Sequence, residues 1–405
     1  MSSLPEPQLL KHTLRVQLPA FVATRTVLNT MVRMVYPFLP IFGRNLGVDL
    51  WLLSLALTIR SSSGVFGPFL ASIADSRGRK AGMLFGLLLF TAGVGLMSVF
   101  PSYPAFVAAL VLTIVGNFVF IPSMQAFLGD RVAYQRRGAA LAITEFGWSL
   151  SFILGVPLAG LLMERVGWLA PFPALTALGL LAILFLTWLL PGDKPHATAG
   201  LPNFWQNLRK VLTYGPALAG IALGFAMSGG NEIVNVVFGV WMEDRFGLQI
   251  AALGAASAVI GISELGGESL VSLLVDRIGK TRALAVGLLL NAVAAIGLPM
   301  LGQSVTGALV GLFFFYLTFE FTIVSSLPLL TEVMPSARAT LMAIFIAGMS
   351  LGRALGALLA SRLYLAGFWA NGAAAAIFNL LALLMLLVLV KSSHKLQNEE
   401  LIEQA

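Results

Sequence analysis

Nine charged side chains fall inside the long apolar runs of this 405-residue chain, where a charge is expected only if it has a functional or structural role. Four are arginines and five are glutamates: Arg25, Arg33, Arg60, Arg353, Glu145, Glu232, Glu264, Glu268 and Glu320. A charge at the centre of a bilayer costs roughly 2.5–3.5 kcal/mol even on insertion scales, so each one requires a partner or water. The near balance of signs indicates pairing around a hydrated cavity inside the protein.

Glu264 and Glu268 are the strongest candidates for carrying protons, because a spacing of four residues stacks them on one helical face. Two carboxylates so close in a low-dielectric site do not both ionise easily, which raises the proton affinity of at least one. The alternative is that Arg60 or Arg353 holds one or both carboxylates in static gate bridges. Two further carboxylates are candidates for proton coupling: Glu145 and Glu320.

A second polar face lies along the first apolar run. It is formed by residues spaced four apart, Arg25, Asn29 and Arg33, with Tyr36 close by. This face must avoid lipid. Glu232 occupies nearly the position equivalent to Arg33 in the second half of the chain, so the two either form a permanent bridge or both contact a ligand. Arg25 lies nearer the start of the run, and we expect its side chain to extend toward the membrane interface.

The composition identifies an integral membrane protein. Hydrophobic residues make up 58% of the chain and charged residues 11%, and the mean hydropathy of +0.91 exceeds that of ordinary water-soluble domains. The apolar runs are about 20 residues long, which favours spanning helices over the short alternating strands of a porin. The chain has no cysteine, and its three histidines lie outside the runs, so any buried proton relay must use carboxylates. The polar N-terminal residues argue against a cleaved signal peptide.

Twelve apolar runs are present, and we expect each to form one helix of an all-α membrane protein. They cover residues 14–42, 52–75, 81–100, 105–129, 138–162, 168–190, 216–241, 250–275, 283–302, 305–333, 339–364 and 368–390. The expected domains are an N-tail (1–13), a six-helix bundle (14–190), a polar central loop (191–215), a second six-helix bundle (216–390) and a tail (391–405). Residues 203–210 in the central loop suit a short helix at the membrane interface.

The second half of the chain repeats the first at an offset of 201 residues. The segment Asp75-Ser-Arg-Gly-Arg-Lys80 after the second run corresponds to Asp276-Arg-Ile-Gly-Lys280 after the eighth. Four further pairs keep this register, and one pair is offset by 200: Gly86 and Gly287, Arg137 and Arg338, Gly147 and Gly348, Gly155 and Gly356, and Gly47 and Gly247. This self-similarity predicts two pseudo-symmetric halves with an interface between them.

The basic residues are distributed by side of the membrane. Seventeen of the 25 Lys and Arg residues fall in the two tails, the central loop and the loops between alternate runs. This positive-inside pattern predicts a multi-pass protein of the inner (plasma) membrane with both termini cytoplasmic. The same distribution argues against nucleic acid as a partner, although the sequence pI is about 9.9.

The two six-helix halves, the polar central loop and the paired loop motifs resemble the major facilitator superfamily of secondary transporters over about residues 14–390. The first motif departs from the family pattern at Ala71 and Ser76. The resemblance implies that Asp75 caps the start of the eleventh helix and Asp276 that of the fifth, which latches the halves together on the cytoplasmic side. The predicted gate-loop residues are Asp75, Gly78, Arg79, Lys80, Asp276, Arg277, Gly279 and Lys280.

The resemblance also implies that the first and seventh helices line a central cavity between the halves. Small residues on the fifth and eleventh helices would then lie where the halves meet: Gly147, Ser151, Gly155, Gly348, Gly352 and Gly356. The predicted substrate-cavity residues are Asn29, Arg33, Tyr36, Arg60, Asn117, Gln125, Trp148, Asn231, Glu232, Asn235 and Arg353.

A family member of this kind moves a small molecule by alternating access, with a proton gradient as the expected driving force. The 28 Phe and 14 Met residues among scattered polar groups favour export of small amphipathic compounds. The segment Gly155-Val-Pro-Leu-Ala-Gly160 resembles, in degraded form, a motif of the family's proton-driven exporters, but residues 108–127 lack the arginine that such exporters carry.

Two other functions are compatible with the sequence. The arginines Arg33, Arg60 and Arg353 suit uptake or exchange of an organic anion, and a receptor would bind a ligand without moving it. A membrane-embedded enzyme is disfavoured, because no nucleophile-plus-base or metal-ligand spacing is present. We therefore expect no cofactor and no metal, and a monomer in the lipid bilayer.

Overall fold

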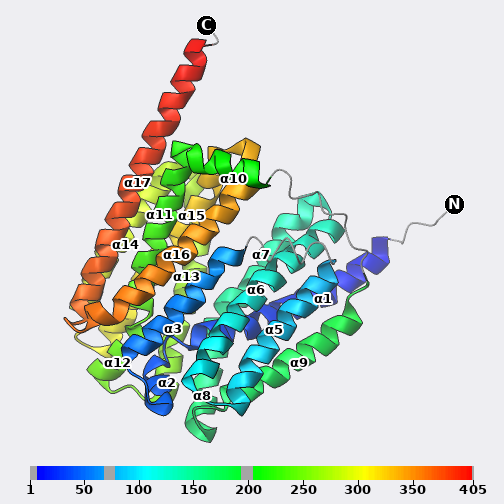
Figure 1. Ribbon diagram of the computed structural model, residues 1–405, viewed down its shortest axis with the longest axis vertical. Coiled ribbons are helices and arrows are strands. Elements are labelled where there is room, and N and C mark those ends of the chain that lie inside the picture. Colours follow the sequence, from blue (N-terminus) through cyan, green and yellow to red (C-terminus); the bar gives the residue numbers. More distant parts are fainter. Residues whose placement is uncertain (1–6, 68–77, 193–203, 404–405) are drawn as a thin grey trace, which may run out of the picture.

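The computed structural model describes residues 7–67, 78–192 and 204–403, and every regular element in these ranges is helical (Figure 1). The first bundle contains α1 (Pro7–Met34), α2 (Leu39–Leu46), α3 (Leu50–Ser62), η1 (Ser63–Phe66), α5 (Arg79–Val99), α6 (Tyr103–Arg131), α7 (Tyr134–Leu150), η2 (Ser151–Gly155), α8 (Val156–Val166) and α9 (Pro171–Leu189). The second contains α11 (Gly215–Asn235), α12 (Phe238–Phe246), α13 (Ile250–Ile278), α14 (Lys280–Leu301), α15 (Val305–Val333), η4 (Pro335–Ala337), α16 (Arg338–Tyr364) and α17 (Phe368–Glu403).

Ten helices in the described ranges are long and apolar enough to cross a membrane. The other two expected spans are the first two in the sequence. The first consists of α1 and α2, and α1 carries three arginines. The second consists of α3 and η1, and the residues that follow it, 68–77, lie outside the described part. The protein therefore has the predicted fold, an all-α membrane protein of two pseudo-symmetric six-helix bundles.

The internal repeat is visible in the backbone itself. Within the described residues, the left-handed conformations fall at glycines in equivalent positions of the two halves. These are Gly47 (φ 66°) and Gly247 (63°), Gly78 (98°) and Gly279 (86°), and Gly167 (131°) and Gly367 (106°). An L side chain is strained in this region, so glycine is the residue that lets both halves make the same three turns.

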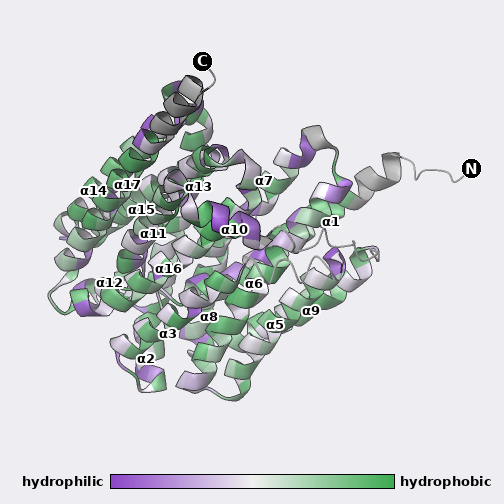
Figure 2. Cartoon of the chain, turned by 45° about the horizontal axis from the view of Figure 1, so that its top comes forward, coloured by the Kyte–Doolittle hydropathy of each residue, from purple (hydrophilic) through white to green (hydrophobic). Residues whose placement is uncertain are grey.

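The bundles meet at one end of the molecule and separate toward the other, where both chain ends and α10 (Phe204–Thr213) lie (Figure 1). We call these ends the closed face and the termini face. The expected helix in the central loop is therefore present as α10, where Trp205 is 66% exposed and hydrophilic residues lie along its outer side (Figure 2). Its inner side packs through Val211 on the first turns of α11 and α16.

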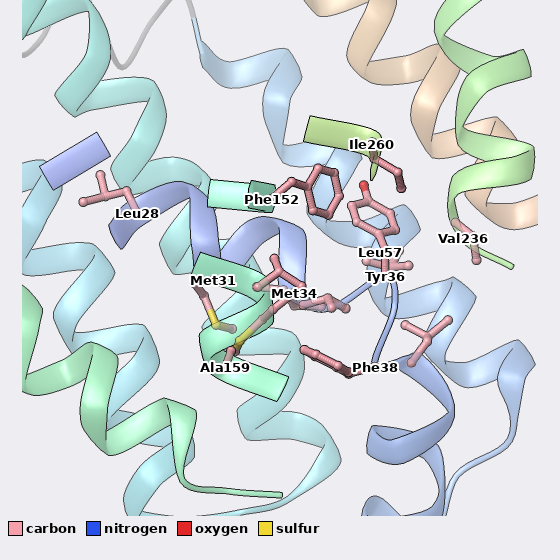
Figure 3. Packing of buried hydrophobic residues seen from close by; sticks show 14 of the residues in the cluster. Leu28, Met31, Met34, Tyr36, Phe38, Leu57, Phe152, Ala159, Val236 and Ile260 are labelled. Carbon is pink, nitrogen blue, oxygen red and sulfur yellow. The ribbon is translucent and has the colours of Figure 1, made fainter. Parts of the chain in front are cut away.

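One hydrophobic core extends along the N-terminal bundle and continues into the C-terminal bundle near the closed face. Figure 3 shows Tyr36, Phe152 and Ile260 close together in this core, although they come from the α1–α2 connection, η2 and α13. Phe38 adds to this contact between the bundles. Its ring would lie 3.0 Å from a Cβ added at Gly160 in α8 and 3.3 Å from one added at Gly254 in α13. Shared burial of this kind holds the two halves together at this end.

The predictions of unbroken helices over residues 14–42 and 216–241 are wrong. The first breaks between Met34 and Leu39, and the second between Asn235 and Phe238. Pro37 supplies no backbone N–H and so interrupts the helical ladder of the first. The second break contains no proline and lies at the equivalent place in the other half, next to Gly239, which meets the backbone of Pro37.

The glycines predicted to lie between the halves on the fifth and eleventh helices face their own bundles. Gly147 and Gly155 pack against α1, where a Cβ at Gly147 would lie 2.6 Å from that of Arg25. Gly348 and Gly352 pack against α11 in the same way. The fifth and eleventh helices do meet the other half, but through other residues. A Cβ added at Gly261 of α13 would lie 2.9 Å from the Ser149 carbonyl of α7, and one added at Gly64 of η1 would lie 2.8 Å from the Cβ of Ser350 of α16.

We predict that Gly239→Ala prevents full closure of the closed face. A methyl group there would lie 2.6 Å from the Cα of Pro37 and from two backbone oxygens, which cannot move aside as a side-chain end can. Overpacking of this kind costs about 1–3 kcal/mol, and separation of the halves relieves it. The labelling rate of a cysteine introduced at Val156, a buried position near the closed face, should rise. Gly297→Ala, where nothing lies within 4 Å of the added methyl, should leave that rate unchanged. Equal accessibility in the two variants would contradict this interpretation.

Candidate substrate cavity

A cavity of about 750 Å³ lies between the bundles. Every residue predicted to line a substrate cavity borders it: Asn29, Arg33, Tyr36, Arg60, Asn117, Gln125, Trp148, Asn231, Glu232, Asn235 and Arg353. The four predicted proton-coupling candidates also border it: Glu145, Glu264, Glu268 and Glu320. The structure thus brings side chains from eight helices to one chamber, of a size suited to a drug-sized molecule.

The deepest part of the cavity wall is a polar network that joins the halves. Tyr36 donates from its hydroxyl to Glu232 at 2.9 Å and accepts a hydrogen bond from Arg60. Arg60 lies 3.5 Å from the same carboxylate. Asn235 extends the network from Glu232 to Tyr316, whose hydroxyl donates to the Asn235 amide oxygen at 2.7 Å. All five side chains are less than 9% exposed, so each depends on the others for hydrogen bonds.

Arg33 forms the second ion pair between the halves, with Glu264 and not with Glu232. Its guanidinium lies 4.0 Å from the centre of the Trp148 ring and 3.7 Å from that of Phe152, and it donates to the Trp148 carbonyl at 3.0 Å. The carbonyl lies in the last turn of α7, just before the π-helical turn η2, and also accepts a hydrogen bond from the Ser151 hydroxyl. The N-terminal bundle therefore fixes Arg33 on three sides.

Arg25 does not extend toward the membrane interface as expected. Its two terminal nitrogens donate to both oxygens of Glu145, at 2.7 and 2.8 Å, in a bidentate pair within the first bundle. The alternative bridges from Arg60 or Arg353 to Glu264 or Glu268 are not present in the described structure, where Arg33 pairs with Glu264 and Arg60 with Glu232. Periodicity places Arg25 and Arg33 on one face of α1, but the neighbouring helices decide which carboxylate each one meets.

Solvent exposure shows from which side the cavity is open. The exposed fraction of the carboxylate side chain rises from 2% at Glu232 to 6% at Glu264 and 42% at Glu145. Their arginine partners are Arg60 on α3 and Arg33 and Arg25 on α1. Of these three, Arg25 is nearest the termini face. The cavity therefore opens toward the termini face and is sealed toward the closed face.

Three charged residues of the cavity wall form no ion pair or hydrogen bond with any other described side chain: Glu268, Glu320 and Arg353. Four buried polar atoms of the wall also have no partner there: Arg25 Nε, Asn117 Oδ1, Asn231 Nδ2 and Glu264 Oε2. A buried polar group without a hydrogen bond is costly, so such atoms mark where water or a ligand can bind.

Polar contacts between the halves close the opposite end. Arg44 and Glu243 form an ion pair at 2.8 Å, and Glu164 accepts a hydrogen bond at 2.8 Å from the backbone N–H of Ala251, in the first turn of α13. In a third contact between the bundles, the Arg362 guanidinium lies 4.3 Å from the ring centre of Trp51. Each contact joins one bundle to the other, so all three must separate if this face opens.

The gate loops on the termini face contact their own bundles. Arg79 pairs with Asp130 at 3.3 Å, and its equivalent Lys280 pairs with Glu332. Lys80 donates to the carbonyls at the end of α9 at 2.6 and 2.7 Å. Asp75 lies outside the described residues, and Asp276 and Arg277 are exposed. Asp276 makes no hydrogen bond with the described part of α7, so the predicted latch across the halves remains a prediction.

Tyr316 and Phe152 are cavity residues that the sequence analysis missed. A signal for Tyr316 was present, because it precedes Glu320 by four residues and so shares its helical face. Phe152 follows Trp148 by four residues in the same way. Within an apolar run, such an aromatic residue is indistinguishable from ordinary packing until the neighbouring helix is placed.

A family model described as Major Facilitator Superfamily matches residues 24–335 and 220–404. The chain belongs to the major facilitator superfamily. It is accordingly a transporter of small molecules and not an enzyme. Among proteins of this superfamily, the MFS-type transporters YbcL and YceJ of Bacillus subtilis (strain 168) are each 27% identical to it. The match covers 60% of this chain and 61% of YbcL, and 85% of this chain and 88% of YceJ.

A more distant relative is the quinolone resistance protein NorA of Staphylococcus aureus, which is 23% identical over 53% of this chain and 55% of its own length. Among solved structures, a bacterial homologue of the human lysosomal transporter Spinster, in an inward-facing and unoccupied conformation, has a TM-score of 0.71. It is 15% identical and covers 96% of this chain and 99% of that one, which supports the superfamily fold.

Proposed function

We propose that this superfamily member exports small amphipathic organic compounds by alternating access, driven by a proton gradient. The observation that carries the proposal is the cavity, which is sealed at the closed face, open at the termini face and bordered by carboxylates without partners. Apolar side chains of α6, α15 and α16 make up much of its wall, which suits the body of an amphipathic compound. The similarity to NorA over about half of each chain adds support for export.

We place the termini face in the cytoplasm of the cell that carries the protein in its inner membrane. The concentration of Lys and Arg in the tails and in the loops of that face supports this orientation. The described conformation is then open to the cytoplasm, the side from which an exporter takes its substrate. The closed face opens next, when the two buried ion pairs between the halves, Arg33–Glu264 and Arg60–Glu232, separate together with the surface pair Arg44–Glu243. A monomer suffices, since one chain supplies the whole cavity.

Proton coupling rests on the arrangement of three carboxylates from the C-terminal bundle. Glu264 and Glu268 lie one helical turn apart on α13, and between them Gly267 packs so closely on α15 that its added Cβ would lie 2.8 Å from the Cβ of Glu320. Only Glu264 has a cationic partner, Arg33. Gain or loss of a proton at Glu264 changes that attraction between the halves, so proton binding and the choice of open face are linked.

We predict that Glu264→Gln and Glu268→Gln variants lose the response of transport to a pH gradient. A glutamine keeps the size of the side chain but cannot bind or release a proton. In proteoliposomes, a gradient that is acidic on the side opposite the substrate should accelerate wild-type transport. The variants should retain exchange between equal substrate pools and lose that acceleration. If both variants respond to the gradient as the wild type does, these carboxylates are not the coupling site.

An organic-anion transporter is the second candidate, because Arg353 borders the cavity without an ionic partner among the described residues. In that case Arg353→Gln would abolish exchange of a carboxylate substrate and leave exchange of a neutral amphipathic compound intact. Counterflow measured with both compounds in the same vesicles separates the two functions.

A further inference from the structure

We infer that Glu164 is a positioning residue of the transport cycle, because it caps the start of α13 from the opposite bundle only while the closed face is sealed. Its carboxylate accepts a hydrogen bond at 2.8 Å from the backbone N–H of Ala251. Glu164 belongs to α8 of the N-terminal bundle, and Ala251 lies in the first turn of α13. We call this contact the interbundle cap. The inference rests on the proposed function only in that the closed face is taken to open during transport.

The start of α13 has no cap of its own. The first N–H groups of a helix lack partners within the helix, and the side chain just before it commonly accepts one of them. In α3, the equivalent helix of the first half, Asp49 accepts from the Leu52 N–H at 2.8 Å. The equivalent of Asp49 is Gln249, at the same offset of 200 residues as Gly47 and Gly247. Gln249 makes no capping hydrogen bond, and the first turn of α13 contains no acidic residue.

The two halves also differ at the position of the capping carboxylate. Glu164 precedes Gly167 by three residues, and Tyr364 precedes the equivalent Gly367 by three. The Tyr364 hydroxyl donates to Asp244 of its own bundle at 2.9 Å. So where α16 packs on α3, which carries its own cap, this position is a tyrosine turned to its own bundle. Where α8 packs on α13, which lacks a cap, it is a carboxylate. The two differences complement each other.

Close backbone packing places Glu164 over the start of α13. At Gly160, one helical turn before Glu164, an added Cβ would lie 3.2 Å from the Ile250 carbonyl and 3.4 Å from the Cα of Gly254. Residues four apart share a helical face, so Glu164 lies one turn further toward the closed face, where α13 begins. Separation of the two helices at this face breaks the hydrogen bond. The interbundle cap is therefore lost when the face opens.

The capped helix also carries Glu264, which pairs with Arg33 of the N-terminal bundle in the cavity wall. Glu264 lies 13 residues after Ala251, about 20 Å along the helix. The N-terminal bundle thus holds α13 at two points, in the cavity and at its first turn. Loss of the outer contact should lower the free energy needed to open the closed face and leave the cavity unaltered.

A cysteine reporter tests the cap without substrate or a pH gradient. Val156 is fully buried, and its carbonyl would lie 3.3 Å from a Cβ at Gly254 in the other bundle. A Val156→Cys protein should react slowly with a water-soluble maleimide while the face is sealed. Glu164→Ala should raise the labelling rate about fivefold, the typical effect of losing one cap.

A cap within one bundle provides the matched control. Asp49 and the N–H group that it accepts from both belong to α3 of the N-terminal bundle, so this cap persists whichever face is open. Asp49→Ala should therefore lower the thermal stability of the protein and leave the labelling of Val156→Cys unchanged.

Supplying α13 with a cap of its own is the sharper test. Gln249→Ser and Gln249→Asp each place a preferred capping side chain just before the helix. That cap is present whichever face is open, so Glu164 no longer favours the sealed state. Labelling should rise about fivefold although no contact has been removed, and Glu164→Ala combined with Gln249→Ser should give no further rise. If Glu164 only stabilised the fold, Gln249→Ser would instead offset Glu164→Ala.

The inference requires Glu164→Ala and Gln249→Ser each to raise labelling, with effects that do not add, and any other pattern overturns it. A rise with Gln249→Asp but not with Gln249→Ser would show repulsion between two carboxylates in place of capping. Fraying of the first turn of α13 makes the opposite prediction, because Gln249→Ser stabilises that turn and would slow labelling.

This labelling assay involves no transport, so its outcome is independent of the flux experiments. If the variants give the expected pattern but vesicles show no flux, the proposed export fails and the interbundle cap stands. If flux is found and the Glu164→Ala protein labels at the original rate, the proposed transport stands and the interbundle cap fails.

Discussion

Replacing Glu232 by leucine is expected to shift the protein strongly toward the conformation in which the closed face is open. The change leaves the Arg60 guanidinium, 4% exposed, without its carboxylate in the interior. Removing one partner of a buried ion pair costs about 3–5 kcal/mol. Because Arg60 and Glu232 belong to different bundles, separation of the halves lets water reach the arginine, and the protein can avoid most of that cost.

The absence of cysteine from the natural chain makes this shift measurable. Val156 is fully buried in α8, and its carbonyl would lie 3.3 Å from a Cβ at Gly254 in the other bundle. A Val156→Cys reporter should react with a water-soluble maleimide slowly in the otherwise unchanged protein and on the order of a hundredfold faster with Glu232→Leu.

Two further variants control this experiment. Arg60→Met combined with Glu232→Leu should return labelling close to its original rate, since an apolar pair replaces an ion pair at little cost. Tyr36→Phe removes both hydrogen bonds of the hydroxyl, but only the one to Glu232 joins the two halves. It should therefore give a smaller shift, of about 1 kcal/mol. Unchanged labelling of the Glu232→Leu protein would show that the network does not hold the halves together.

Joining the two bundles across the closed face should stop transport. Arg44 and Glu243 are paired at 2.8 Å and belong to different bundles. With Arg44→Cys and Glu243→Cys linked by a short bifunctional thiol reagent, the closed face cannot open, so flux should fall to that of protein-free vesicles. A reagent that contains a disulfide allows transport to be restored by reduction.

A matched link within one bundle serves as the control. The Tyr364 hydroxyl donates to Asp244 at 2.9 Å, and both residues belong to the C-terminal bundle on the same face. The Asp244→Cys/Tyr364→Cys protein, linked with the same reagent, should therefore transport at nearly its unlinked rate. Full-speed transport by the linked Arg44→Cys/Glu243→Cys protein would mean that the halves do not move apart here.

The sealed end combines apolar packing with few polar contacts, and this has a consequence for the transport cycle. The Arg44–Glu243 pair lies at the surface, with Arg44 58% exposed, where such pairs contribute at most about 1 kcal/mol. The buried pairs Arg33–Glu264 and Arg60–Glu232 are far more sensitive to loss of a partner. Control of opening therefore resides mainly in the cavity wall, where a substrate or a proton can reach it.

The sequence alone determined the membrane setting, the two equivalent halves and the set of polar residues around the cavity. Apolar length, the offset of 201 residues and the cost of an intramembrane charge are local or periodic properties, which can be read without knowing how helices pack. The glycine turns illustrate this, since Gly78 and Gly279 adopt left-handed backbone at the positions where the repeat aligns them.

Only the tertiary structure decided which charges meet and which remain unpaired. Arg33 lies on the face of α1 that the periodicity predicts, yet it pairs with Glu264 on α13 and leaves Glu232 to Arg60 and Tyr36. Periodicity fixes the direction of a side chain about its own helix axis, but not the depth and rotation of neighbouring helices. Those depend on contacts distant in sequence, such as Gly239 on Pro37, and they determine that Glu268, Glu320 and Arg353 remain available to a ligand.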